Sequence, residues 1–233
     1  MFYLGIDVSK AKLHACLLLD ELGKTKSKTV ENTPSGITTL LAWAARQDAT
    51  PDQLHVVMEA TGVYHETAAQ ALFDAGVTVS IVNPAQARDF ARSLAVRTKT
   101  DGVDGFVLAR FGSLLKPMAW QPPSPEVRTL QALLARREAL VQDLRREHNR
   151  QEKALATTTP ERILKSIKDT LAFLDQELAK LQQDINDHIN RHPNLKDDLA
   201  LLTSIPAVGP QVGTHLLVIL QSHAFLSAEQ LAA

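Results

Sequence analysis

Several features are scarce in this chain of 233 residues, and each scarcity excludes a class of protein. Cysteine occurs once, so the chain cannot close an internal disulfide, and the apolar run around Cys16 predicts a small buried side chain. No apolar stretch approaches the roughly 18–20 residues that a membrane span needs. The first residues, MFYLGIDVSK, do not have the pattern of a signal peptide. We therefore expect a cytoplasmic protein that does not enter a membrane.

Charge of one sign is also scarce, because the formal net charge is −1. The charges are nevertheless unevenly distributed along the chain. Residues 1–80 carry 6 Lys or Arg against 9 Asp or Glu, residues 86–116 carry 6 against 3, and residues 128–168 carry 10 against 5. The basic middle of the chain could follow a phosphate backbone. A solvated helical face with mixed charges explains the same counts about as well.

Residues 1–116 have the pattern of an α/β domain. Short apolar runs predict strands at 2–8, 13–19, 54–60 and 77–82, and a third run near 26–31 could pair with the first two. Helices are expected over 34–47, over 64–75 and from Pro84 onward. Three hairpin-like strands followed by alternating helices and strands indicate a mixed sheet with helices on both faces. This is the element order of ribonuclease-H-like domains.

Four carboxylates on separate segments of this domain form a candidate metal site. Asp7 lies on the first strand and Glu59 at the carboxyl end of a second buried strand, where sheets of this kind bind ligands. Asp101 and Asp104 are three residues apart and share one helical face. Carboxylate oxygens suit Mg²⁺, and two such ions could clamp the oxygens of a phosphodiester transfer. Each acid also has an ordinary structural explanation as a solvated, turn-adjacent or helix-capping residue.

Basic residues precede the acidic pair and are candidates for phosphate contact: Arg88, Arg92, Arg97 and Lys99. Lys99 could instead simply neutralise Asp101. Farther along the chain, His188 and His192 are one helical turn apart, a spacing able to hold a transition metal. No third ligand is evident, and we expect these histidines to favour a helix C-terminus.

The composition changes at the proline-rich stretch 116–125. Two long amphipathic helices are predicted beyond it, at about 126–154 and 160–191, with Thr159 as the cap of the second, and they indicate a helical hairpin or coiled coil. A third segment, LLTSIPAVGPQVGTHLLVIL, resembles a helix-hairpin-helix. Its turn at Gly209 and the following helix N-terminus would offer backbone N–H groups to a nucleic-acid phosphate. An ordinary helical turn is the alternative.

Five motifs in the same order resemble the DEDD insertion-sequence transposases of the IS-one-ten family: GIDVSK, MEATGVY, NPAQARDFARS, RTKTDGVDG and SIPAVGP. The resemblance extends from residue 4 to about residue 231. Gly105 departs from it, because the family usually has alanine after the second aspartate of the pair, and glycine should cost some helix stability.

The resemblance implies three parts: a RuvC-like domain at 1–116, a linker with a coiled coil at 117–192, and the beginning of an α-helical transposase domain at 193–233. It also implies DNA recombination guided by a bridge RNA, in an assembly of several protomers that associate through the helical segment. In the family the acidic tetrad binds Mg²⁺, and it corresponds here to Asp7, Glu59, Asp101 and Asp104. The family's nucleophile is a serine in a motif that no serine of this chain occupies. We therefore expect a truncated sequence that does not complete strand exchange.

The sequence leaves three other functions open. A RuvC-like junction nuclease would use the same four acids to hydrolyse DNA. A non-catalytic remnant would still bind RNA or DNA. GIDVSK also resembles the first phosphate loop of sugar-kinase and actin-like ATPases, but the glycine-rich adenosine site of that fold has no counterpart after residue 112.

Overall fold

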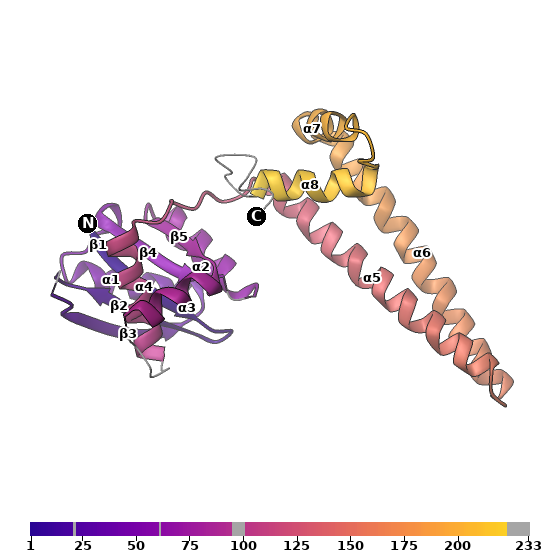
Figure 1. Ribbon diagram of the computed structural model, residues 1–233, viewed down its shortest axis with the longest axis horizontal. Coiled ribbons are helices and arrows are strands. Elements are labelled where there is room, and N and C mark those ends of the chain that lie inside the picture. The colour runs from indigo at the N-terminus through magenta and orange to yellow at the C-terminus, as the bar shows by residue number, and fades with distance from the viewer. Residues whose placement is uncertain (21, 61, 95–100, 223–233) are drawn as a thin grey trace. The chain divides into compact units, whose positions relative to one another are not determined.

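The computed structural model describes residues 1–20, 22–60, 62–94 and 101–222, and in the helix that begins at Asp101 it describes side chains from Asp104 onward. This part of the chain forms two compact units, Met1–Pro122 and Pro123–Ala233. None of its helices is both long and apolar enough to cross a membrane. Figure 1 labels the elements of both units.

The first unit contains a mixed sheet of five strands. They are β1 (Phe2–Val8), β2 (Lys12–Leu18), β3 (Thr25–Glu31), β4 (Leu54–Glu59) and β5 (Thr78–Val82). The strand order is β3-β2-β1-β4-β5, in which β1, β2 and β3 pair antiparallel while β4 is parallel to both β1 and β5. The expected α/β class, with three hairpin-like strands and then alternating helices and strands, is confirmed.

Among its described residues this unit has four helices and one short 3-10 turn: α1 (Pro34–Ala45), η1 (Pro51–Gln53), α2 (Tyr64–Asp74), α3 (Pro84–Ser93) and α4 (Asp101–Leu115). Local sequence explains where they begin and end. Thr33 caps α1 by accepting a hydrogen bond from the Gly36 backbone N–H, with Pro34 in the first turn. Gly76 follows α2 with a φ of +82°, a left-handed conformation that favours glycine at a helix end.

Both faces of the sheet are covered. Leu4, Ile6 and Val8 of β1 point to the face that shares the main hydrophobic core with α1 and α2. Side chains alternate along a strand, so Tyr3, Gly5 and Asp7 point to the opposite face. There α4 packs on β1, and a smaller apolar cluster joins Val57 and Val82 to α3 and α4. The acid on β1 therefore lies on the α4 face of the sheet.

The second unit is helical: α5 (Pro125–Leu155), α6 (Glu161–Arg191), α7 (Pro193–Thr203) and α8 (Pro210–Ser222). The helices α5 and α6 form a long antiparallel hairpin, and α7 and α8 lie at the end where α5 begins and α6 finishes (Figure 1). One buried cluster unites all four helices, with Leu130 from α5, Ile185 from α6, Leu195 from α7 and Leu217 from α8. The expected boundary between the coiled coil and a transposase domain, at residue 193, stays a prediction.

One local expectation for this unit is wrong. Pro160, rather than Thr159, occupies the N-cap position of α6, and it makes no side-chain capping hydrogen bond. The Thr159 hydroxyl instead lies 2.9 Å from the hydroxyl of Thr157. In the loop between α5 and α6 the two threonine hydroxyls are therefore within hydrogen-bond distance of each other. Helix α6 begins without a side-chain cap.

Candidate acidic site

Asp7 and Glu59 come from neighbouring parallel strands. Ile6 of β1 is aligned with Met58 of β4, so the next residues along the two strands are Asp7 and Glu59. They lie near the carboxyl ends of β1 and β4, and strand alternation directs both side chains to the α4 face. Both are half-buried. Two carboxylates that are distant in sequence are therefore neighbours at one edge of the sheet.

The helix α4 crosses β1 at very close range on this face. A Cβ atom placed on Gly5 would overlap the carbonyl oxygen of Gly105 and the backbone nitrogen of Ala109. Farther along the helix, a Cβ on Gly112 would lie 2.7 Å from Val57 Cγ2 and 2.9 Å from Tyr3 Cδ1. Because early α4 lies over Gly5 and late α4 over Tyr3, the helix runs antiparallel to β1. Its first turn is therefore at the carboxyl end of the strand.

The remaining two acids occupy that first turn. Asp104 immediately precedes Gly105 and is half-buried, while Asp101 is the first residue of α4. The structure thus brings Asp7, Glu59, Asp104 and the backbone of Asp101 to the same end of the sheet. The side chain of Asp101 lies outside the described part. Among the side chains that are described, no group of three or more His, Cys, Asp or Glu is placed to hold a metal ion.

The donor set nevertheless fits a hard divalent cation. All the side chains concerned are carboxylates, the oxygen ligands that Mg²⁺ prefers. The three described acids, Asp7, Glu59 and Asp104, lie where a parallel pair of strands ends, and half-burial leaves each of them accessible to a ligand. The four residues are therefore candidate ligands of a divalent cation.

A histidine that sequence reasoning did not single out lies beside the acids. His14 of β2 is the direct cross-strand partner of Asp7, and Thr29 of β3 is the partner of His14. The hydroxyl of Thr29 lies 3.1 Å from His14 Nδ1. The three residues form one row across the sheet on the α4 face. The sequence did contain a signal for this residue, because His14 is the one polar residue in the otherwise apolar run LHACLLL.

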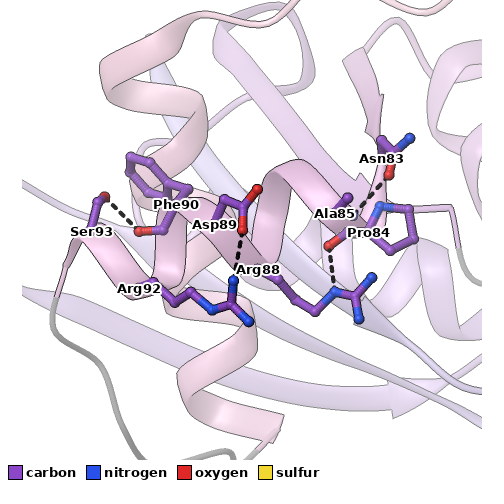
Figure 2. Close-up of polar contacts among 8 residues, drawn as sticks. All are labelled: Asn83, Pro84, Ala85, Arg88, Asp89, Phe90, Arg92 and Ser93. Atoms are coloured by element: carbon purple, nitrogen blue, oxygen red, sulfur yellow. Dashed lines mark hydrogen bonds and ion pairs between the residues drawn. The ribbon is translucent and has the colours of Figure 1, made fainter.

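The two described basic candidates lie on α3 (Figure 2). Asn83 caps this helix by accepting a hydrogen bond of 2.8 Å from the Ala85 N–H. Arg88 donates from Nε to the carbonyl oxygen of Pro84 at 3.2 Å, and Arg92 pairs with Asp89 at 3.1 Å. Both guanidinium groups are exposed. They are available to a polyanion, although no hydrogen bond or ion pair between described residues joins them to the acids.

The other basic candidates, Arg97 and Lys99, lie outside the described residues. Gly209 lies in the second unit, where it is exposed and directly precedes Pro210, the first residue of α8. The turn before it is held by a hydrogen bond of 3.0 Å from the Val208 N–H to the Ile205 carbonyl oxygen. Ala207 takes the left-handed conformation there, with a φ of +71°. A short turn thus joins α7 to α8, and the resemblance of this segment to a helix-hairpin-helix stays a prediction.

The two histidines near the end of α6 make structural hydrogen bonds. His188 is buried, and its Nε2 lies 2.8 Å from the carbonyl oxygen of Glu126 at the start of α5. His192 Nδ1 lies 2.7 Å from the carbonyl oxygen of His188, and the two rings are 4.5 Å apart. His188 thereby fastens the end of α6 to the beginning of α5. Within the described residues no third metal ligand accompanies them.

Comparison with known proteins shows to which family this chain belongs. The sequence profile of the DEDD transposases of IS110-type (IS-one-ten) elements, described as transposase, matches residues 4–160. Two similar proteins are both named pilin gene-inverting protein, from Moraxella lacunata and Moraxella bovis. Each is 34% identical to this chain over 232 residues, which is 99% of this chain and 70% of the relative. The chain therefore belongs to the IS110 family of DEDD transposases.

Membership confirms the resemblance carried by the five sequence motifs. It makes the chain a relative of DNA transposases and recombinases, and it identifies DNA as the substrate class of the family. The sugar-kinase and actin-like alternative is thereby removed. Family membership does not by itself identify the metal ion, a guide RNA or the roles of individual residues.

Proposed function

We propose that the first unit is a ribonuclease-H-like, RuvC-like domain that binds Mg²⁺ through Asp7, Glu59, Asp101 and Asp104 and acts on DNA phosphodiesters during recombination. The observation that carries this proposal is the antiparallel run of α4 over β1, in which Gly105 lies against Gly5. It supports a common location for acids from three distant segments. Family membership supports DNA as the substrate.

The roles of the chain's residues follow from their chemistry. Mg²⁺ supplies Lewis-acid stabilisation of the charge that develops on a phosphodiester during transfer. Asp7 and Glu59, on the sheet, would hold the ion, and the acids of the first turn of α4 would complete its ligands from the adjoining helix. His14, whose Nδ1 lies 3.1 Å from the Thr29 hydroxyl, is the cross-strand neighbour of Asp7 and would lie beside the bound DNA.

DNA contact is assigned to basic side chains and one helix end. Arg88, Arg92, Arg97 and Lys99 hold the backbone near the acidic site, and Gly209 offers the N-terminal turn of α8 to a phosphate. The exposure of Arg88 and Arg92 supports the assignment for that pair. Such contacts position nucleic acid without reading its sequence.

The same proposal includes the family's further partners. A bridge RNA made from the element's own ends would guide target choice, and the serine nucleophile would come from the family's serine motif, which none of these 233 residues occupies. Self-association would use the α5–α6 hairpin, where Val141, Leu155, Ile163 and Phe173 are exposed apolar side chains. Sequencing the gene beyond codon 233 tests the serine, and light scattering of Phe173→Ser tests the interface.

Titration calorimetry tests the metal site. Wild-type protein should bind Mg²⁺, and Asp7→Asn combined with Asp104→Asn should abolish the heat of binding. The matched control, Asp52→Asn combined with Asp184→Asn, changes the net charge equally at exposed positions outside the site and should bind as wild type does. Unchanged Mg²⁺ affinity in the Asp7 and Asp104 variant would sink the proposal.

Activity assays separate the recombinase from its alternatives. Hydrolysis of a branched DNA by the 233-residue chain would favour a RuvC-like nuclease. Binding of structured RNA or DNA without any cleavage, even in a chain that carries the serine motif, would favour a non-catalytic remnant. A recombinase instead requires strand transfer that depends on both the acids and the serine.

Salt dependence tests the basic contacts. Replacing Arg88 and Arg92 by glutamine should lower the slope of log K against log salt by about 2 for duplex DNA, because each phosphate contact contributes about 0.9. The control pair Arg46→Gln and Arg162→Gln removes the same charge from exposed positions on α1's C-cap and on α6. It should leave the slope within error of the wild-type value.

A further inference from the structure

The second unit contains a cavity of about 690 Å³ that the proposed metal chemistry does not use. Its walls come from all four helices of that unit, including the first turn of α8 from Gly209 onward. Pockets that hold small organic ligands are of this size, roughly 300–1,000 Å³. The cavity is thus large enough for one nucleotide.

The floor of the cavity is apolar. Leu134 of α5 and Ile185 and Ile189 of α6 line it, and all three belong to the buried cluster that holds the four helices together. Leu199 of α7 completes this surface. Because these side chains are fixed by the packing of the unit, the floor is a rigid surface. The face of a planar aromatic group would be desolvated on it.

The rim of the cavity carries an ordered chain of polar groups. Arg137 donates from Nε to Gln182 Oε1 at 3.0 Å, and Gln182 donates from Nε2 to Asn186 Oδ1 at 3.1 Å. These bonds hold the three side chains in place and still leave donors on the Arg137 Nη groups and on the Asn186 amide. Within the described residues the Arg137 Nη groups make no hydrogen bond or ion pair. His215 of α8 faces the same cavity.

The charge of the lining selects among possible ligands. Arg137 is basic, and none of the described residues that line the cavity is Asp or Glu. An apolar floor, amide groups at the edge and a guanidinium with no acidic partner among the described residues match a base, its hydrogen-bonding edge and its phosphate. A base in a duplex could not reach such a cavity. The ligand must therefore be an unpaired nucleotide.

We propose that this cavity of the second unit binds one unpaired nucleotide of a nucleic acid, with its base on Leu134, Ile185 and Ile189 and its phosphate at Arg137. The site is independent of the acidic residues of the first unit. It would distinguish looped or bulged strands from a continuous duplex. The probes below decide whether RNA or DNA supplies the nucleotide.

The test uses the full chain in EDTA, so that failure of the metal site does not affect it. The probes are fluorescein-labelled 20-base-pair stems of RNA and of DNA, each with one 2-aminopurine bulge, and the same stems without the bulge. Fluorescence anisotropy gives the affinities, and 2-aminopurine emission reports entry of the bulged base into the cavity. Wild-type protein should prefer at least one bulged stem over its paired form by about tenfold, or about 1.4 kcal/mol.

Two variants change the cavity and two matched variants do not. Asn186→Trp fills the cavity from its rim, whereas Asn190→Trp places the same side chain on an exposed part of α6. Arg137→Gln removes the cationic group, whereas the neighbouring exposed Arg136→Gln removes an equal charge outside the cavity. Circular dichroism establishes that all four fold.

The cavity variants should lose the preference for the bulge and the change in 2-aminopurine emission, while the matched variants keep both. Equal wild-type affinity for bulged and paired stems of both RNA and DNA would overturn the proposal. Retention of the preference in Asn186→Trp, or its equal loss in Arg136→Gln and Arg137→Gln, would overturn it as well.

Discussion

Gly5 of β1 and Gly105 of α4 lie against one another, so closely that a Cβ atom on Gly5 would overlap the carbonyl oxygen of Gly105. In the opposite direction the contact is less severe. A Cβ on Gly105 would lie 3.2 Å from Cys16 Cβ and 3.4 Å from the Gly5 carbonyl oxygen. This contact sets how near the first turn of α4 comes to Asp7. Because it is tighter at Gly5 than at Gly105, replacing the two glycines by alanine should have different effects on stability.

Gly5→Ala should strongly destabilise the first unit, because the new methyl group would meet backbone atoms that cannot rotate away. We expect the free energy of unfolding to fall by about 2–3 kcal/mol or more, as for severe overpacking. Urea denaturation followed by tryptophan fluorescence measures it, since both tryptophans, Trp43 and Trp120, pack in the first unit. Gly209→Ala changes the second unit, at a position where nothing lies within 4 Å of the added Cβ, and should leave this first-unit transition unchanged.

Gly105→Ala should be close to neutral. Alanine in a helix interior is favoured over glycine by about 1 kcal/mol, while the crowding against Cys16 and His14 opposes that gain. We expect a change of less than about 1 kcal/mol in the same urea experiment. A loss approaching that of Gly5→Ala would mean that α4 cannot shift by the few tenths of an ångström that the methyl group needs.

His55 should make the stability of the first unit depend on pH. It is buried, its Nε2 lies 2.8 Å from the Ser80 hydroxyl, and burial lowers the pKa of its imidazole below the ordinary 6.5. As pH falls below about 6.5 the unfolded chain takes up a proton that the folded chain does not, so stability present above that pH is lost.

The measurement is urea denaturation of wild type and His55→Gln between pH 7.5 and pH 5. His55 should contribute a slope of up to about 1.4 kcal/mol per pH unit below its unfolded pKa. His14 and His65 of the same unit remain in both proteins, so the difference between the two pH profiles isolates His55. Parallel profiles would contradict this assignment.

Metal should stabilise the first unit and leave the second unaffected. If Mg²⁺ binds the folded acids and not the unfolded chain, a concentration 100 times the Kd adds about 2.7 kcal/mol. The transition followed by tryptophan fluorescence should therefore move to a higher temperature with Mg²⁺, and EDTA should reverse the shift. A shift of equal size in Asp7→Asn plus Asp104→Asn would show that the cation acts elsewhere.

Much of the fold followed from the sequence because its signals are local. Short runs predicted the strands of the first unit, and helices were expected from residue 34 and from Pro84, where α1 and α3 begin. The long amphipathic pattern gave α5 and α6 to within one or two residues. The cap of α6 was wrongly assigned to Thr159, because the loop contains several threonines and the local sequence does not decide which groups their hydroxyls contact.

The candidate site could be predicted only in part. Its acids were recognisable from their residue type and strand-end positions, and the family from five motifs in order. His14 was missed because its importance depends on pairing with Asp7 across strands, which no local pattern specifies. The cavity in the second unit is lined by four helices, and its lining residues Leu134 and His215 are 81 residues apart, so it also could not be predicted from local patterns.

The sequence by itself determined the elements, the family and the chemical type of the acidic residues, because propensity, capping and motif are properties of neighbouring residues. Only the tertiary structure decided that α4 runs antiparallel to β1, with Asp104 at the end of the sheet that carries Asp7 and Glu59. That direction depends on a close contact between Gly5 and Gly105, which are 100 residues apart. Steric fit between distant segments is decided only when they pack.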